Sequence, residues 1–481
     1  MISYIVRIPA ECVKKKIGAL AQKYKYRYTG KATGPMFPHA AAKQKYIYGG
    51  NMKIAGIIAE YNPFHHGHAY QIRELKSKTG ADYVIAAMSG DFVQRGAPAV
   101  MDKYARAKMA LSCGIDLVLE LPSLWSASSA PYFAESGVLL FDRMHCIDYL
   151  CFGAETENLS LFYDLADLLV DEPPTFSHAV TGFLKQGLSY PLAAEYALKK
   201  AGVEDTAFLS SPNNILALEY IKALRRQNSP ITPYLIKRSG AGYHDRSLSA
   251  KNPSASAIRS FLLRQKTGRY GRLEKTVFSR IMPDSSLHMI DEYQRNSVFL
   301  SQDDFSAILY YALLSKSADE LSDAADLTPE IANRLKNRLP MFQSFSQFTG
   351  LMKSRNVTYA RMSRILLHIM LGHTKKDYAR FRESGSIPYL RILGLNKTAS
   401  PLLSVIKKSA DIPLISKASA AKNILSANAL ALFQKDIYAA DLYEQVKFMK
   451  SHSGAHTKRQ AAENIPLSAS SDMAQKIVTA P

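Results

Sequence analysis

Two histidines, His65 and His68, follow a short apolar run at residues 54–58 and are separated from it by Asn62 and Pro63. A strand that turns into a helix here would place both imidazoles at the carboxyl end of the strand, where open α/β sheets bind ligands. Imidazole can donate to phosphate oxygens, and it can carry charge while a pyrophosphate leaves. The pattern therefore favours a nucleoside triphosphate site.

Gly67 stands between the two histidines and has no Cβ, so a base or a phosphate could approach the main chain there. The N-terminus of the following helix would add free N–H groups and a positive dipole end. Two other interpretations stay open, because a His-x-x-His pair can also ligate a metal or simply begin a helix. A metal is less favoured, since no third ligand lies at a recognisable spacing nearby.

Polar residues also follow other apolar runs. Arg95 comes after the run at 83–88 and could neutralise a carboxylate or a phosphate, or be a solvated loop residue. Gly153 ends a later run and would let a base or a ribose lie against the backbone. Asn213 and Asn214 could hold a nucleotide or cap a helix.

A second group of polar residues comes later in the chain. Arg238 follows a short turn, and Ser254, Ser256 and Arg259 stand at an expected helix start. Hydroxyls, helix N–H groups and a guanidinium would form a second phosphate cradle that faces the first. An ordinary helix cap is the alternative, but the upstream histidines favour phosphate binding.

Composition limits the class of protein. The 481 residues carry a net charge of +20, which usually signals a polyanionic partner such as a nucleic acid, although solvated lysines could account for part of it. The four cysteines form no Cys-x-x-Cys pair. No stretch approaches the roughly eighteen apolar residues of a membrane helix. We expect a reduced, cytoplasmic protein with no membrane segment.

Short apolar runs alternate with helical patterns from residue 52 onward. Runs that are apolar on both faces, as in buried parallel strands, lie at 54–58, 83–88, 116–121 and 149–152. Helices are expected between them at 69–78, 103–113 and 127–140. This rhythm predicts an α/β fold with a Rossmann-like, doubly wound parallel sheet.

We divide the chain into four parts. Residues 52–265 form the predicted catalytic domain, and residues 266–450 form a mainly α-helical domain, because helical spacing replaces the alternation there. Its expected helices lie at 305–315, 329–339, 360–371 and 427–449. Residues 451–481 lack a persistent period and are expected to be a flexible tail.

The first part, residues 1–51, is basic and differs from the rest. It could be a nucleic-acid-binding arm, an amphipathic targeting peptide or the product of an upstream translation start. We favour the last, with the segment disordered, because Met52 stands immediately before the first convincing strand.

Several segments carry a family resemblance. They are residues 56–68, 89–96, 116–122 and 211–216, together with Ser254, Ser256 and Arg259. With them, the chain from about residue 52 to about residue 450 closely resembles the tRNA(Met) cytidine acetate ligase family of the nucleotidyltransferase superfamily. Two features depart from the family: His66 stands where an Asn is usual, and residues 1–51 match nothing in it.

The resemblance implies an ATP-dependent ligase that converts ATP to AMP and diphosphate. Such an enzyme activates acetate as acetyl-adenylate and acetylates N4 of the wobble cytidine of elongator tRNA(Met), giving N4-acetylcytidine. Mg²⁺ is expected to accompany ATP, although no protein ligand for it can be named. No protein partner is predicted.

The resemblance also implies site residues. One continuous stretch is expected to contact ATP, namely Ile58, Ala59, Glu60, Tyr61, Asn62, Pro63, Phe64, His65, His66, Gly67, His68, Ala69, Tyr70 and Gln71. Further ATP contacts would be Gly153, Asn213 or Asn214, and Arg238, while Ser254, Ser256 and Arg259 would face the phosphates. The residues expected to act in catalysis are His65, His68, Arg95 and Arg259.

Basic residues of the helical part could follow a tRNA backbone while a splayed anticodon base reaches the adenylate. They are Arg361, Arg364, Lys375, Lys376, Arg380, Arg391, Lys407, Lys408, Lys417 and Lys422. Two other functions stay open: adenylyl transfer to a small cofactor precursor, and RNA binding by a protein with a relic nucleotide pocket. The basic helical half argues against the first, and the intact phosphate-handling residues argue against the second.

Overall fold

The computed structural model describes residues 52–170, 173–188, 190–203, 206, 211–238, 254–264, 278–453 and 477–480. The predicted basic extension at 1–51 lies outside the described residues, as do the 265/266 boundary itself and residues 454–476 of the predicted tail. The chain divides into two compact units. The described part of the smaller one, within 171–210, consists of α7 (Pro174–Lys185) and α8 (Tyr190–Lys200).

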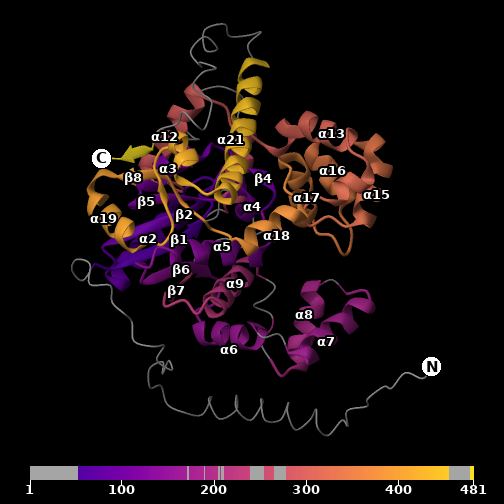
Figure 1. Ribbon diagram of the computed structural model, residues 1–481, viewed down its shortest axis with the longest axis horizontal. Coiled ribbons are helices and arrows are strands. Elements are labelled where there is room, and N and C mark those ends of the chain that lie inside the picture. Colours follow the sequence, from indigo (N-terminus) through magenta and orange to yellow (C-terminus); the bar gives the residue numbers. More distant parts are fainter. Residues whose placement is uncertain are drawn as a thin grey trace. The chain divides into compact units, whose positions relative to one another are not determined.

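The larger unit is built on one mostly parallel sheet (Figure 1). Its strands are β1 (Ile54–Ala59), β2 (Tyr83–Ser89), β5 (Leu117–Leu121), β6 (Tyr149–Ala154), β7 (Thr232–Lys237), β8 (Leu390–Asn396), β9 (Leu414–Ile415) and β10 (Val478–Ala480). They lie in the order β10-β8-β5-β2-β1-β6-β7, and β9 pairs with β8. Only the β5–β8 pair is antiparallel among these described strands.

Helices cover both faces of the sheet, as the alternation predicts. On one face, apolar residues of α2 (His66–Thr79), α3 (Lys103–Ser112), α10 (Ala255–Arg264) and α12 (Asp284–Asn296) share a core with the strands. On the other face, α5 (Ala130–Asp142) lies so close that a Cβ on Gly56 of β1 would be 2.7 Å from the Phe141 ring. The predicted doubly wound α/β fold is therefore confirmed.

The remaining helices complete the larger unit. Beside the sheet lie α4 (Ser123–Ser126), α6 (Leu159–Val170) and α9 (Pro212–Arg226). The later part contains η2 (Gln302–Phe305), α13 (Ser306–Leu314), α14 (Ala318–Ser322), α15 (Pro329–Arg338), η3 (Leu339–Met341), α16 (Phe345–Met352), α17 (Tyr359–Leu371), α18 (Lys375–Glu383), η4 (Lys397–Ala399), α19 (Ser400–Ser409), η5 (Ala418–Ala420), α20 (Ala421–Ile424) and α21 (Ala427–Ser453). No helix among the described residues is long and apolar enough to cross a membrane.

The predicted division between residues 265 and 266 needs correction. The helices from η2 to α17 do form a core of their own, as expected. However, the chain then returns to the sheet, where β8 pairs with β5, and the described residues on both sides of the boundary, apart from those within 171–210, belong to one compact unit. The predicted flexible tail is also wrong at its two ends, because α21 continues to Ser453 and residues 478–480 form β10 beside β8.

A short hairpin connects the sheet with the helical part. After β2 the chain forms β3 (Phe92–Val93) and β4 (Ala97–Pro98), with Gly96 between them. Gly96 has φ of 73°, and a Cβ there would overlap the backbone of Arg364 in α17. Its carbonyl accepts hydrogen bonds from Ser363 Oγ at 2.8 Å and from Gln302 Nε2 at 3.2 Å.

We expect Gly96→Ala to lower the free energy of unfolding by about 1–3 kcal/mol, because the new methyl group meets backbone and the left-handed conformation becomes strained. Gly350→Ala in α16 is the matched control, since no atom lies within 4 Å of its added Cβ. There we expect no loss and a gain of up to about 1 kcal/mol from helix propensity. Chemical denaturation measures both, and equal stability of the two variants would contradict this packing.

Candidate active site

The turn between β1 and α2 is held on both sides. Tyr61 has φ of 45°, a conformation that is uncommon for a residue other than glycine and that clusters at functional sites, and the Asn62–Pro63 peptide is cis. The Asn62 side chain accepts a hydrogen bond from the backbone N–H of Val100 at 2.9 Å. Its carbonyl accepts one from Arg259 Nη1 at 2.8 Å. The turn is thus fixed before any ligand binds.

His65 and His68 hold each other at the start of α2. His65 is the N-cap residue, and its Nδ1 accepts from the Gly67 backbone N–H at 3.0 Å. His68 Nδ1 accepts from the His65 backbone N–H at 3.2 Å, and the two rings stack with centroids 3.8 Å apart. Because each Nδ1 is an acceptor, each neutral ring carries its proton on Nε2. The pair therefore offers two N–H donors.

Desolvation keeps these half-buried imidazoles neutral. Desolvation, followed by the charges of Arg238, His66 and Arg259, lowers the pKa of His65 to about 3. Desolvation and the neighbouring His65 and Arg238 lower the pKa of His68 well below its ordinary value. In the free protein the histidines are consequently neutral donors rather than cations.

Gly67 leaves space for the ring of His65. A Cβ at this position would lie 2.8 Å from His65 Cε1, so the absent side chain makes room for the His65 ring. The predicted approach of a base or a phosphate to the Gly67 backbone stays a prediction beside this contact. Any larger residue would push His65 out of its capping position.

Three guanidinium groups supply the positive charge. Arg259 follows Ser256 in α10 and donates to its Oγ at 3.0 Å. Arg238 follows β7, and its side chain packs over Gly153 at the end of β6. Arg259 is half-buried and Arg238 is exposed, yet desolvation by the surrounding atoms lowers the pKa of each, whereas Glu60 raises that of Arg259 and Glu155 raises that of Arg238.

Arg95 lies on the hairpin after β2. Its pKa is lowered by burial and raised by the carboxylate of Glu60, which also influences Arg259. The Glu60 carboxylate accepts a hydrogen bond from the Gln94 backbone N–H at 3.1 Å. The structure therefore brings the predicted residues His65, His68, Arg95, Arg238 and Arg259 to one edge of the sheet.

Other predicted residues support the chain around the site. Ser211 is the N-cap residue of α9, so neither Asn213 nor Asn214 is the cap. Asn213 Nδ2 donates to Glu155 Oε1 at 2.6 Å, and Asn214 Oδ1 accepts from the Glu155 backbone N–H at 2.8 Å. Both asparagines thus fix the segment after β6. Ser254 accepts a hydrogen bond from the Ala257 backbone N–H, as in a helix cap.

Within the predicted stretch 58–71, several side chains face away from the histidine pair or pack beneath it. The rings of Tyr61 and Phe64 are buried and lie 5.0 and 5.3 Å from that of His68. His66 Nε2 lies 3.3 Å from the Ser279 carbonyl, and Gln71 Nε2 donates to Cys151 Sγ. These contacts fix the side chains around the histidine pair, and the predicted ATP contacts of this stretch stay a prediction.

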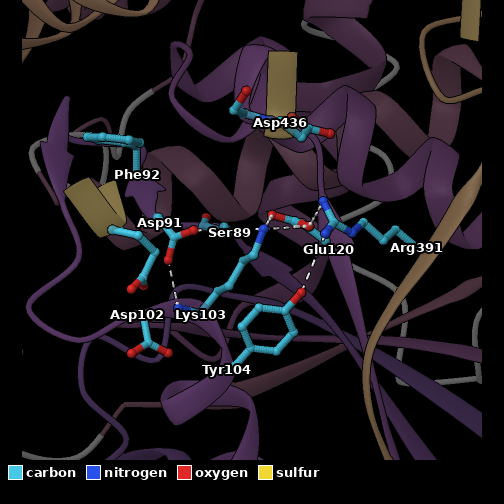
Figure 2. Close-up of polar contacts among 12 residues, drawn as sticks. Ser89, Asp91, Phe92, Asp102, Lys103, Tyr104, Glu120, Arg391 and Asp436 are labelled. Carbon is cyan, nitrogen blue, oxygen red and sulfur yellow. Dashed lines mark hydrogen bonds and ion pairs between the residues drawn. The ribbon is translucent and has the colours of Figure 1, made fainter. Parts of the chain in front are cut away.

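A buried ionic cluster beside the site was not predicted from the sequence (Figure 2). Lys103 Nζ lies 2.9 Å from Glu120 Oε1 and 3.8 Å from Asp91 Oδ2. Arg391 Nη1 lies 3.0 Å from Glu120 Oε2. Desolvation raises the pKa of Asp91 to about 6, although Lys103 and Arg106 oppose the shift.

The cluster corrects one prediction. Arg391 is 3% exposed and pairs with Glu120, so it is not available to an RNA backbone as predicted. The sequence feature that could have indicated this burial is the position of Arg391 inside the apolar run 390–395. A charged residue in such a run is more often buried and paired than exposed to solvent. Among the described residues, no group of three or more His, Cys, Asp or Glu side chains could hold a metal ion.

Comparison with known proteins places this site in a family. The model of the HIGH nucleotidyltransferase family matches residues 52–459. The tRNA(Met) cytidine acetate ligase of Acetivibrio thermocellus is 36% identical over 82% of this chain and 94% of its own length. That of Thermoanaerobacter sp. strain X514 is 37% identical over 82% of this chain and 95% of its own. The chain belongs to the tRNA(Met) cytidine acetate ligase family.

Solved structures agree with this membership. The crystal structure of apo Thermotoga maritima TmcAL, 26% identical, superimposes with a TM-score of 0.80 and covers 89% of this chain and 99% of that one. A second structure of that protein, bound with alpha-thio ATP, gives a TM-score of 0.76 over the same shares. The fold and family recognised from the sequence are both confirmed.

The neutral state of the histidine pair gives a testable outcome. At about pH 5, an unfolded histidine is mostly charged, whereas His65 and His68 should remain neutral with the proton on Nε2. Because the unfolded chain takes up these protons first, the free energy of unfolding should fall as the pH drops from about 6.5 toward 3. Imidazole nitrogen shifts in NMR spectra, assigned with His65→Asn and His68→Asn, test this, and imidazolium shifts at pH 5 would refute it.

Proposed function

We propose that this protein activates acetate with ATP and transfers the acetyl group to N4 of the wobble cytidine of elongator tRNA(Met). The observation that carries the proposal is the histidine pair with Arg238 and Arg259 on one sheet edge, in a chain of this family. The names of the related ligases and the alpha-thio ATP complex of the Thermotoga protein support it.

In the proposed binding mode, the phosphates of ATP lie at the carboxyl edge of the sheet, between the start of α2 and α10. The Nε2–H groups of His65 and His68 donate from one side, and Arg259, positioned by Ser256, donates from the other. Arg238, which follows β7, and Gly153, at the end of β6, would lie against the nucleoside. Mg²⁺ would accompany the triphosphate, as it usually does, and would neutralise part of its charge.

In the first step, an acetate oxygen attacks the α-phosphorus while the bond to pyrophosphate breaks, leaving acetyl-adenylate. Negative charge grows on the pyrophosphate, and the guanidinium groups with the two Nε2–H donors stabilise it in a low-dielectric site. Arg95 is the candidate to hold the acetate carboxylate, because its hairpin approaches the β1 turn through Gln94 and Glu60.

In the second step, N4 of cytidine attacks the acetyl carbonyl, a proton leaves the nitrogen, and AMP departs. N4 is a weak nucleophile because its lone pair is delocalised, so positioning should supply much of the acceleration. No covalent bond to the enzyme is required at any stage.

The helical part is proposed to bind the tRNA. Of the ten basic residues predicted for this role, seven are exposed: Lys375, Lys376, Arg380, Lys407, Lys408, Lys417 and Lys422. Arg361 and Arg364 are half-buried, and Arg361 pairs with Asp326. Exposed lysines give affinity that falls with salt, as expected for contacts with phosphates. We further propose that residues 52–265 carry the chemistry, that the protein acts in the cytoplasm, and that residues 1–51 are dispensable.

Incubation with ATP, isotopically labelled acetate and tRNA tests the proposed function. We expect label in the tRNA only when ATP is present. His68→Asn should reduce labelling at least about a hundredfold by removing a phosphate donor while leaving tRNA retention on a filter unchanged. His288→Asn, on the exposed surface of α12, is the matched control and should label normally.

Other outcomes would decide against the proposal. Pyrophosphate release that requires a small cofactor precursor instead of acetate would favour an adenylyltransferase. Retention of tRNA with neither product would favour simple RNA binding. Loss of tRNA retention together with labelling in His68→Asn would contradict the division of labour between the two parts of the chain.

A further inference from the structure

Arg106 is a buried cation in α3 that the proposed chemistry does not use. Its side chain is 0% exposed, although a guanidinium group is strongly favoured in water. It lies below the site, in the first half of the helix that follows the β3–β4 hairpin. A charge in such a place needs several partners to be tolerated.

The partners of Arg106 are backbone carbonyl groups from three segments. Nη1 donates to the Glu60 carbonyl at 2.7 Å and to the Ser89 carbonyl at 3.1 Å. Nη2 donates to the Gly90 carbonyl, and Nε donates to the Met101 carbonyl at 3.0 Å. The nearby Asp91 carboxylate interacts with its charge.

The end of strand pairing explains why these carbonyls need Arg106. The last paired residues of the parallel strands β1 and β2 are Ala59 and Met88. Beyond them the two chains separate to form the site, and although Ser89 still pairs with Leu121 of β5, the β1–β2 pairing no longer offers a partner to the carbonyls of Glu60, Ser89 and Gly90. A buried carbonyl without a hydrogen bond is unfavourable, and one planar guanidinium can serve several at fixed angles.

The two chains that Arg106 joins carry different parts of the site. The chain leaving β1 reaches His65 and His68 within a few residues, and the chain leaving β2 reaches Arg95. A second contact links the same chains, because the Gln94 N–H donates to the Glu60 carboxylate. Displacement of one carbonyl against the other would therefore shift Arg95 relative to the histidine pair.

We infer that Arg106 is a positioning residue for acetate activation, which sets the spacing between the histidine pair and Arg95 by binding the carbonyls of Glu60, Ser89 and Gly90. The inference rests on the proposed function. Arg106 contacts neither reactant, and its effect passes entirely through the backbone of the two chains. A displacement of about 1 Å at a reacting centre can reduce the rate about a hundredfold.

Arg106→Lys tests this assignment, because lysine keeps the charge and loses the planar set of donors. The readout is acetate-dependent exchange of labelled pyrophosphate into ATP, without tRNA. We expect kcat to fall at least about tenfold while KM for ATP changes less than about threefold, since the phosphate donors His65, His68 and Arg259 all remain in place. Arg106→Gln, which buries no charge, should likewise lower kcat and leave KM for ATP nearly unchanged.

Arg334→Lys is the matched control. Arg334 in α15 also donates from Nη2 to a backbone carbonyl, that of Met352, at 2.7 Å, but it belongs to the helical core. It should lose stability in thermal unfolding and keep both kinetic constants. This comparison separates a loss of positioning from a general loss of stability.

Each remaining result has a defined meaning. An unchanged kcat in folded Arg106→Lys, or an equal kcat loss in Arg334→Lys, would overturn the inference. Failure of both Arg106 variants to fold would also overturn it, because the residue would then serve the fold as a whole. Absence of exchange in the unaltered protein would contradict the proposed function instead, so the two failures are distinguishable.

Discussion

Parallel strands must separate at their carboxyl ends to leave space for a ligand, and the carbonyl groups freed there need new partners. Here guanidinium groups provide them: the buried Arg106 binds the chains leaving β1 and β2, and the half-buried Arg259 binds the Asn62 carbonyl in the turn after β1. The same edge is held from below by Lys103 between Asp91 and Glu120. The relative position of the histidine pair and Arg95 depends on this replacement of strand pairing by cations.

Desolvation also affects the charges of the histidine and arginine side chains differently. It removes the charge from His65 and His68, whose pKa values fall, and leaves both as neutral donors fixed by their Nδ1 hydrogen bonds. The guanidinium groups of the site keep their charge although desolvation lowers their pKa values, because their ordinary pKa is far higher. Arginine would therefore supply the positive charge that binds a triphosphate, and histidine would supply uncharged hydrogen-bond donors of fixed direction.

The parts that sequence predicted well are those with a local physical signature. Strands β1, β2, β5 and β6 are apolar on both faces, and the helices of the later part repeat at helical spacing. By contrast, β8 was missed because the buried Arg391 interrupts its apolar run, and its partner Glu120 lies far away in sequence. The roles of Gly67, Asn213 and Asn214 depend on long-range or side-chain packing, which a single sequence does not reveal.

In the proposed reaction, this sheet edge joins acetate to the α-phosphate of ATP. Transfer of heavy oxygen from labelled acetate tests it most directly, because the oxygen that attacks phosphorus stays with the phosphate when N4 of cytidine takes the acetyl group. We expect one heavy oxygen in each AMP formed during a tRNA-dependent reaction, measured by mass spectrometry. Unlabelled AMP, or heavy oxygen in inorganic phosphate instead, would contradict it.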